Sequence, residues 1–355
     1  MTALSALLDR FGESEASDLH LTAGGAPYLR LHGEIVPLEN FPAVNAEDLE
    51  KLTRELVGEE AFTRFLRENE LDVAADYRGD RLRINLYRQQ GAIAWSLRRL
   101  PAGFFPLEDL GLPPAVTDLA CTLRHGLVLV TGATGSGKST TLASIINEIN
   151  ATRRCHIFTI EDPVEYLHRN LKAFVSQREV GSDTASFAEA LRRVLREDPD
   201  VVLIGEMRDL TTIRAALTLA ETGHLTFGTL HTASAVDTVT RLIGAFPANE
   251  QDEIRVQLAA TLSLIICQQL IPWSRGGGRS LAAETLVATP AVRALIRENK
   301  VHQLGSVIQT GQQLGMRTMN MSLNALYAAG MVDAARALEW SPNREEMRNL
   351  LGFRQ

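Results

Sequence analysis

The chain has 355 residues, of which 45% are hydrophobic, and carries a formal net charge of −7 at pH 7. This length predicts two globular domains, because a single hydrophobic core rarely organises so many residues. The acidic balance argues against a protein that binds nucleic acid through a cationic face, and the cysteines Cys121, Cys155 and Cys267 are too far apart for a disulfide framework or a zinc site.

Membrane insertion is not expected from this sequence. The most apolar segment, residues 256–267, is interrupted by polar side chains and is far shorter than the ~20 residues that span a bilayer. The N-terminal residues lack the basic and apolar regions of a secretory leader. We therefore predict a cytoplasmic protein with no direct membrane insertion.

The first hundred residues predict a small α+β domain with an antiparallel sheet, over residues 1–100. Apolar residues at helical spacing indicate helices at 4–11 and 46–66. Short runs of strand-forming residues, separated by turn residues such as Arg78-Gly79-Asp80 and Gly91, indicate strands. These strands are expected at 18–21, 28–31, 71–77, 81–88 and 92–98.

Residues 101–113 are expected to link the two domains, because prolines recur there and interrupt both helices and strands. The adjacent Phe104 and Phe105 indicate that the linker packs against something, for which a neighbouring subunit is one candidate. A second domain follows over 114–355. Its continuous apolar runs are typical of strands in a parallel α/β sheet, and its elements from about 290 onward are predicted to be helical. The runs are 127–131, 155–160, 201–204 and 225–230.

The clearest chemical signal lies between the run 127–131 and a predicted helix that begins at Lys138. The chain here matches the complete GxxxxGK[ST] pattern with the residues Gly132, Ala133, Thr134, Gly135, Ser136, Gly137, Lys138 and Ser139. Such a loop turns its backbone N–H groups toward phosphate, while the lysine reaches the terminal phosphates and the hydroxyl of Ser139 can bind Mg²⁺. We predict that these residues and the following Thr140 bind ATP and Mg²⁺.

Two carboxylates are predicted at the carboxyl ends of neighbouring strands, where open α/β sheets bind their ligands. Glu206 ends the run Asp200-Val-Val-Leu-Ile-Gly, which has the form of a Walker B element, and Glu161 ends the run before it. Phosphoryl transfer needs one acid near the metal and one that orients the attacking water. We assign Glu206 to the metal and Glu161 to the water. The roles could be exchanged, and either acid could instead cap a helix or pair with Arg208.

Two histidines, His224 and His231, stand at opposite ends of the run 225–230. His231 falls at the strand end that carries the nucleotide chemistry, so it is a candidate sensor of the terminal phosphate. A core or turn role is the alternative for either ring. His224 is included among the candidate nucleotide-binding residues.

Three arginines of the first domain, Arg81, Arg83 and Arg98, lie on predicted strands, and strand alternation places Arg81 and Arg83 on the same face. Such arginines commonly form a solvated face. The alternative is that they reach the phosphates across an interface as arginine fingers.

Four runs together resemble the Walker A, Asp box, Walker B and His box of the type II/IV secretion ATPases. They are 132–141, 159–166, 196–209 and 222–232. Within this superfamily the chain most resembles the PilT-type pilus retraction ATPases. Residues 16–21 are similar to their first strand, and 291–298 is similar to their C-terminal AIRNLIRE motif.

The resemblance implies a PAS-like N-terminal domain, a RecA-like C-terminal ATPase domain, and a homo-hexamer that hydrolyses ATP to retract type IV pili. It also implies that ATP binds between the two domains, that first-domain arginines complete the site, and that the ring acts on an inner-membrane platform protein. The expected location is therefore peripheral, at the cytoplasmic side of the inner membrane.

Other functions stay open at this point. The same nucleotide site would serve a pilus assembly or type II secretion ATPase, or an accessory paralogue that hydrolyses little ATP and works with a more active retraction ATPase. A nucleic-acid motor is disfavoured by the acidic composition. The runs 240–244 and 316–320 depart from the family pattern without removing a catalytic group, which leaves open whether the chain is the principal motor.

Overall fold

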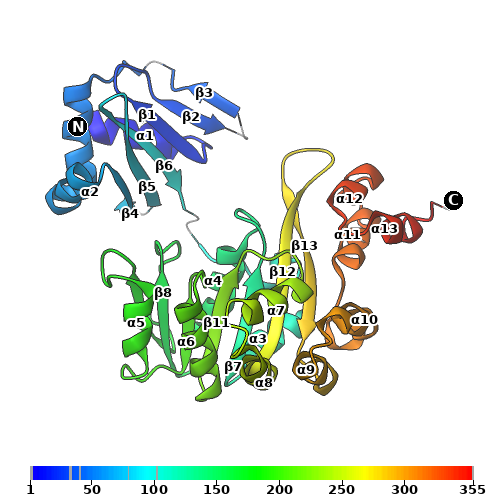
Figure 1. Ribbon diagram of the computed structural model, residues 1–355. Helices are drawn as coiled ribbons and strands as arrows, with labels where there is room; N and C mark the ends of the chain where they lie inside the picture. Colours follow the sequence, from blue (N-terminus) through cyan, green and yellow to red (C-terminus); the bar gives the residue numbers. More distant parts are fainter. Residues whose placement is uncertain (1–2, 32–33, 40, 79, 101–102, 354–355) are drawn as a thin grey trace. The chain divides into compact units, whose positions relative to one another are not determined.

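The computed structural model describes residues 3–31, 34–39, 41–78, 80–100 and 103–353, and Figure 1 shows its course. Two compact units make up this structure. One contains the residues up to Gly103 together with Pro163–Leu167, and the other contains Phe104–Asp162 and the residues from His168 onward. The expected turn residue Gly79 and the first two residues of the expected linker lie outside the described residues.

The first unit is built on a six-stranded sheet in the order β3-β2-β1-β6-β5-β4, in which every neighbouring pair is antiparallel. The strands are β1 (Asp18–Thr22), β2 (Tyr28–Leu31), β3 (Glu34–Pro37), β4 (Glu70–Tyr77), β5 (Asp80–Gln89) and β6 (Ala92–Arg99). Two helices, α1 (Ala3–Glu13) and α2 (Ala46–Glu68), accompany it. All the strands and helices predicted for this region are present, and only β3 was not predicted.

Alternation along the strands gives this sheet one apolar and one polar face. On the apolar face, Trp95 is fully buried and its Nε1 donates to Thr53 Oγ1 of α2 at 2.8 Å. The core here combines residues of both helices and the sheet, among them Leu7, Phe11, Leu49, Phe62, Phe65, Leu19, Ile84 and Leu97. The helices therefore cover one face, and the arginines discussed below lie on the other.

The second unit is built on a seven-stranded sheet in the order β13-β12-β7-β11-β10-β8-β9. Its strands are β7 (Gly126–Thr131), β8 (His156–Glu161), β9 (Phe174–Glu179), β10 (Val201–Ile204), β11 (Leu225–Leu230), β12 (Leu262–Pro272) and β13 (Arg279–Val287). All neighbours are parallel except the β12–β13 pair. Every residue of β7, β10 and β11 is buried, as expected for strands that are covered on both faces.

The four predicted strands of this sheet are confirmed, while β9, β12 and β13 were not predicted from the sequence. The apolar segment 256–267 proves to contain the end of helix α8 and the first half of β12. A mostly apolar segment of this kind does not distinguish a buried helix from a buried strand, which explains why β12 was not predicted from the sequence.

Helices surround the second sheet and form the C-terminal region, as predicted from residue 290 onward (Figure 1). The helices are η1 (Leu107–Leu110), α3 (Pro114–Thr122), α4 (Lys138–Thr152), α5 (Phe187–Val194), α6 (Leu210–Glu221), α7 (Ala235–Gly244), α8 (Gln251–Thr261), α9 (Pro290–Arg297), η2 (Val301–Gln303), α10 (Leu304–Thr310), η3 (Gln312–Leu314), α11 (Met319–Ala328), α12 (Ala334–Trp340) and α13 (Arg344–Leu350).

From Phe104 onward, the expected linker belongs to the second unit, while Gly103 belongs to the first. Leu110 and Leu112 are buried in a core that also contains residues of β7 and α4. The prolines therefore do not make this segment a separate connector, because its leucines have an apolar surface to pack against.

Within the described ranges, no helix combines the length and the apolar character needed to cross a membrane.

Candidate active site

The GxxxxGK[ST] loop connects β7 to α4, which begins at Lys138. Ala133, Thr134 and Gly135 are exposed at the top of the loop, and the hydroxyl-bearing Ser139 is exposed on the first turn of the helix. Lys138 Nζ donates to the carbonyl oxygens of Gly132 at 2.8 Å and Ala133 at 3.0 Å. The loop thus has the strand–loop–helix setting that its sequence predicts, with its lysine lying over its own backbone.

Glycine is required at two points of the loop by close contacts as well as by backbone angles. Gly132 and Gly137 have φ values of 142° and 89°, which disfavour residues with a Cβ. A Cβ on Gly132 would lie 2.3 Å from the carbonyl oxygen of Gln268, and a Cβ on Gly137 would lie 3.2 Å from its Nε2. The loop is therefore packed closely against β12, chiefly against the backbone and side chain of Gln268.

Gln268 is a residue of this site that sequence reasoning missed. It is buried, and its Nε2 donates to the carbonyl of Ser136 at 2.9 Å. Its position in the sequence carries no motif, because it is 132 residues from Ser136. Only the pairing of β12 with β7 brings it to the loop.

The donor groups present fit a nucleotide with its magnesium ion. Ser136 Oγ and Gln268 Oε1 are buried without a hydrogen-bond partner in the described structure, and a Cβ on Gly135 would meet no atom within 4 Å. The described residues hold no group of three or more His, Cys, Asp or Glu that could bind a metal. Mg²⁺ needs no such group in a P-loop site, where it is bound by few protein oxygens together with phosphates and water.

Glu206 follows β10 and is held by two side chains at the same sheet edge. Arg208 Nε contacts Glu206 Oε1 at 2.7 Å, and Arg208 Nη2 donates to Oε2 at 2.7 Å. His231, just after β11, places Nε2 at 2.9 Å from Glu206 Oε1. Chiefly the hydrogen bonds from Arg208, opposed by partial burial, lower the pKa of Glu206 below its usual value of 4.5. The carboxylate is therefore ionised, and the predicted alternative of pairing with Arg208 is also observed.

Glu161 ends β8, the neighbour of β10. Its Oε1 accepts hydrogen bonds from Thr159 Oγ1 at 2.7 Å and from Gln177 Nε2 at 3.2 Å. Gln177 lies on the edge strand β9 and was not among the sequence candidates. The strands β7, β11, β10 and β8 run parallel and side by side, so the loop, His231, Glu206 and Glu161 all stand at the same edge of one sheet.

His224 lies at the opposite end of β11 from His231. Its Nδ1 is 3.1 Å from Thr222 Oγ1 and 3.1 Å from the carbonyl oxygen of Leu219, so it closes the turn after α6. A six-residue strand separates it by roughly 20 Å from the edge that carries the phosphate-binding loop. The turn role that was the alternative for His224 is therefore observed, and its inclusion among the nucleotide-binding residues stays a prediction.

The arginines of the first unit lie on the polar face of its sheet. Arg81 Nε donates to the carbonyl of Val164 at 3.0 Å, and Arg81 Nη1 contacts Asp76 at 3.2 Å. Arg83 lies 3.7 Å from Asp72 and 3.9 Å from Glu165. Both arginines therefore reach the 163–167 segment, which begins two residues after Glu161 in the sequence.

Arg98 stands directly opposite both Arg83 and Asp18 in the sheet register. Its Nε donates to Asp18 Oδ1 at 2.8 Å. Burial would raise the pKa of Asp18, but hydrogen bonds from Ser17 and Arg98 outweigh it and lower this pKa. Arg98 thus pairs with an acid of β1, whereas Arg81 and Arg83 pair with acids of β4 and also contact the 163–167 segment.

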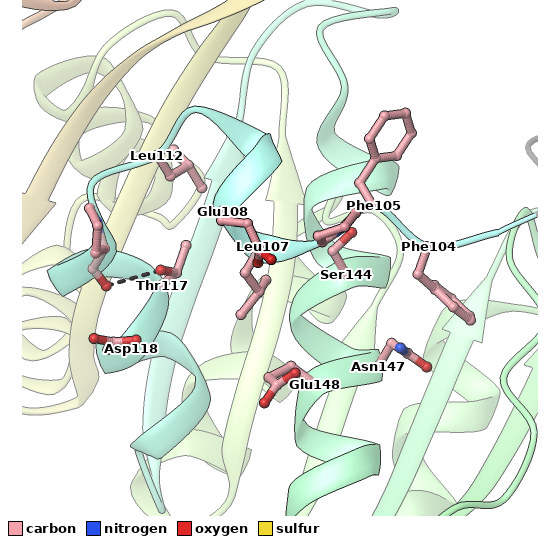
Figure 2. Close-up of a pocket in the computed structure, with 12 residues that line it drawn as sticks. Phe104, Phe105, Leu107, Glu108, Leu112, Thr117, Asp118, Ser144, Asn147 and Glu148 are labelled. Carbon is pink, nitrogen blue, oxygen red and sulfur yellow. Dashed lines mark hydrogen bonds between the residues drawn. The ribbon is translucent and has the colours of Figure 1, made fainter.

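A cavity of about 590 Å³ lies beside the described linker residues and is separate from the phosphate-binding loop. Figure 2 shows Phe104, Phe105 and Leu107 on the linker next to Ser144, Asn147 and Glu148 of α4. None of the loop residues 132–139 lines it. The cavity therefore follows the flank of the helix whose first turn carries Lys138 and Ser139.

Known proteins resemble this chain in both sequence and fold. A family model described as Type II/IV secretion system protein matches residues 94–276. The type IV pilus retraction ATPase PilT of Pseudomonas aeruginosa is 44% identical over 337 residues, which cover 95% of this chain and 97% of that protein. The type IV pilus ATPase PilU of the same organism is 37% identical over 346 residues, which cover 97% and 90%.

Solved structures agree with these relatives. A crystal structure of the pilus retraction motor PilT with bound ADP has a TM-score of 0.91 and 46% identity, and covers 98% of this chain and 99% of that chain. The ATPase DotB of Legionella pneumophila has a TM-score of 0.82 and 29% identity, and covers 96% of each chain. These likenesses confirm the predicted α/β fold class, with a PAS-like N-terminal domain before a RecA-like ATPase domain. They also confirm the predicted resemblance to the PilT-type ATPases. The chain therefore belongs to the type II/IV secretion system protein family.

Proposed function

We propose that this protein is a hexameric motor that hydrolyses ATP to power type IV pilus retraction. The observation that carries this proposal is the meeting of four groups at one edge of a single sheet: the phosphate-binding loop, His231, Glu206 and Glu161. Phosphoryl transfer depends mostly on positioning and on stabilising charge, which is what such a cluster supplies. The family membership supports the coupling of this chemistry to a secretion or pilus machine.

Each group has a proposed task in this site. Backbone N–H groups of residues 132–139 would hold the phosphates, and Lys138 would exchange its two loop carbonyls for phosphate oxygens. Ser139 and Glu206 would hold Mg²⁺, which neutralises the charge that develops on the phosphates. Glu161, fixed by Thr159, would orient and deprotonate the attacking water. His231, bonded to Glu206, would respond to the terminal phosphate.

The first-unit arginines are proposed to complete the charge stabilisation. Arg81 and Arg83 contact the 163–167 segment, which follows the proposed base by two residues. Arg98 is retained as a candidate because its side chain is 63% exposed, although its Nε is bonded to Asp18. A ring of six subunits, an inner-membrane platform protein as partner, and a peripheral position at the inner membrane are part of the same proposal.

The test is steady-state ATP hydrolysis with Mg²⁺ by the purified full chain, measured together with its oligomeric mass. Glu161→Ala and Glu206→Ala should each abolish turnover while the hexamer persists. The exposed Glu253→Ala on α8 is the matched control and should turn over ATP like the wild type. Restoration of twitching in a retraction-deficient strain by the wild type, and not by Glu161→Ala, would then establish the direction of work.

The outcomes separate the alternatives. A wild-type hexamer that binds ATP without hydrolysing it would replace the motor by an accessory subunit that serves a more active paralogue. Hydrolysis with restored pilus extension but not retraction would make the chain an assembly motor. Full activity in both acid variants would show that neither Glu161 nor Glu206 is needed for hydrolysis, and would refute the proposed site.

A further inference from the structure

Gln177 lies between the proposed base, Glu161, and His168, the residue that directly follows the 163–167 segment. Its Nε2 donates to Glu161 Oε1 at 3.2 Å, and its Oε1 accepts from the backbone N–H of His168 at 2.7 Å. The ring of His168 is stacked on Phe104, with 4.6 Å between the ring centres and 23° between the planes. Phe104 is the first residue of the second unit, directly after Gly103 of the first.

The orientation of the Gln177 amide is fixed by these two contacts. A backbone N–H can only donate, so the amide oxygen must face His168. The amide nitrogen must then face Glu161, which as a carboxylate can only accept. The amide cannot turn over without losing both hydrogen bonds. A displacement of His168 therefore moves the amide group that donates to Glu161.

His168 is a neutral and enclosed ring in this chain of contacts. Burial lowers the pKa of His168 to about 4, and its Nδ1 is buried without a hydrogen-bond partner in the described structure. The ring therefore makes an uncharged stacking contact with Phe104. The position of the His168 ring therefore depends on its contact with Phe104 and not on an ion pair.

We infer that Gln177 is a positioning residue for Glu161, and that it links the orientation of this carboxylate to the linker ring of Phe104 through His168. The inference rests on the proposed role of Glu161 as the base. Gln177 and Thr159 donate to the same carboxylate oxygen, and they are paired with each other in the β8–β9 register. A displaced Phe104 would shift His168, and with it the amide that holds Glu161.

The first arm of the test compares single-turnover ATP hydrolysis by the wild-type hexamer and by Gln177→Leu across pH. Leucine keeps the volume but cannot donate, so the chemical step should slow by up to roughly 100-fold, the cost of misplacing a catalytic group by ~1 Å, with the affinity for ATP unchanged. The acid side of the rate profile should also move to higher pH, because a donated hydrogen bond favours the ionised carboxylate. A loss of strand stability alone would not move the profile.

The second arm asks whether the linker acts through Gln177. Phe104→Ala should slow the chemical step in the wild-type background and have no further effect in the Gln177→Leu background. Phe105→Ala is the matched control, because Figure 2 shows its ring pointing in a different direction from that of Phe104. Ser176→Ala, whose hydroxyl contacts His156 at 2.9 Å, is the control for strand β9. Both controls should leave the pH profile unmoved.

The results distinguish this inference from the proposed function. If the wild type is active and Glu161→Ala is not, an unmoved pH profile in Gln177→Leu overturns the positioning role. Additive effects of Phe104→Ala and Gln177→Leu overturn the link to the linker. If the wild type does not hydrolyse ATP, or if Glu161→Ala is fully active, the proposed function fails and this inference fails with it.

Discussion

At the scale of single residues, Gln268 braces the phosphate-binding loop from a distant strand. Its amide donates to the carbonyl of Ser136, and both Gly132 and Gly137 approach it too closely for a Cβ to be accommodated without a shift. The loop is therefore shaped by this contact as well as by its own glycines. A loop held in its phosphate-binding form loses less conformational entropy when nucleotide binds.

Replacing Gln268 should weaken nucleotide binding. Gln268→Leu leaves the buried carbonyl of Ser136 without its donor, at a cost of about 1–3 kcal/mol. If about half of this cost is specific to the bound state, the Kd for ADP should rise roughly 2- to 12-fold. Fluorescent-nucleotide titration measures the Kd. Gln269→Leu, the next residue on β12 with its side chain on the other face, serves as control. Equal Kd values for the two variants would contradict the bracing role.

Glu206 should give the protein a pH-dependent contribution to stability. Its pKa in the folded chain lies below the usual 4.5, chiefly because of Arg208. The contribution is therefore fully present above pH 4.5 and is lost as the pH falls through the lower, folded-state pKa. Because Arg208 is 69% exposed, the pair should stabilise the fold by less than about 1 kcal/mol.

Urea unfolding of wild type and Arg208→Met at several pH values tests this point. The difference between their midpoints should be constant above pH 4.5 and should shrink as the pH falls below it. Arg192→Met, at an exposed arginine of α5, is the control for the loss of a surface arginine. A difference that grows at acid pH would mean that Arg208 does not favour the ionised carboxylate.

At the scale of elements, helix α9 is anchored to the end of helix α8. Val292 and Ile296 are fully buried in the main core of the second unit. Arg293 Nη1 donates to the carbonyls of Ala259 and Ala260 at 2.6 and 2.5 Å. These carbonyls are among the last of α8, where a helix lacks internal partners and a cation is favourable. The motif-like segment 291–298 therefore has a packing role.

Arg293→Met should destabilise the second unit through this contact. The variant leaves the carbonyls at the end of α8 without their charged donor, so the unfolding free energy should fall by about 1.5–3 kcal/mol. Arg297→Met, exposed on the same helix, should change it far less. Thermal unfolding and ATP turnover below the melting temperature measure both properties. A wild-type melting temperature with lost turnover in Arg293→Met would instead make this residue directly functional.

At the scale of the whole molecule, the buried thiol of Cys267 reports opening of the second unit. Cys267 is fully buried in the main core, and burial raises the pKa of its thiol to about 12. Cys155 is only half-buried. A thiol that is both enclosed and protonated reacts only when the structure around it opens.

Bound nucleotide should therefore protect Cys267 from thiol reagents. ADP at about 100 times its Kd should reduce the open population, and hence the labelling rate, roughly 100-fold if ADP binds only the closed form. Mass spectrometry of peptides that contain Cys267 and Cys155 gives the two rates in one sample. The half-buried Cys155 is the internal control and should be protected much less. Rapid labelling of Cys267 with ADP bound would show that local motion exposes it.

The sequence by itself determined the features that depend on consecutive residues. The phosphate-binding loop, the strand that precedes it and the helix at Lys138 follow from one continuous pattern of glycines and apolar residues. The acids Glu161 and Glu206 could be predicted because each ends its own apolar run. Alternation in the first unit likewise placed Arg81 and Arg83 on one face, and the register agrees.

Only the tertiary structure decided which distant side chains support these groups. Gln268 and Gln177 reach the site from β12 and β9, strands that the sequence did not reveal. The same holds for the contact of Arg81 with the 163–167 segment, and for the position of His224 at the far edge of its strand. A hydrogen bond between such residues depends on strand order and register, which are set by the packing of the whole core, so no local pattern in the sequence records it.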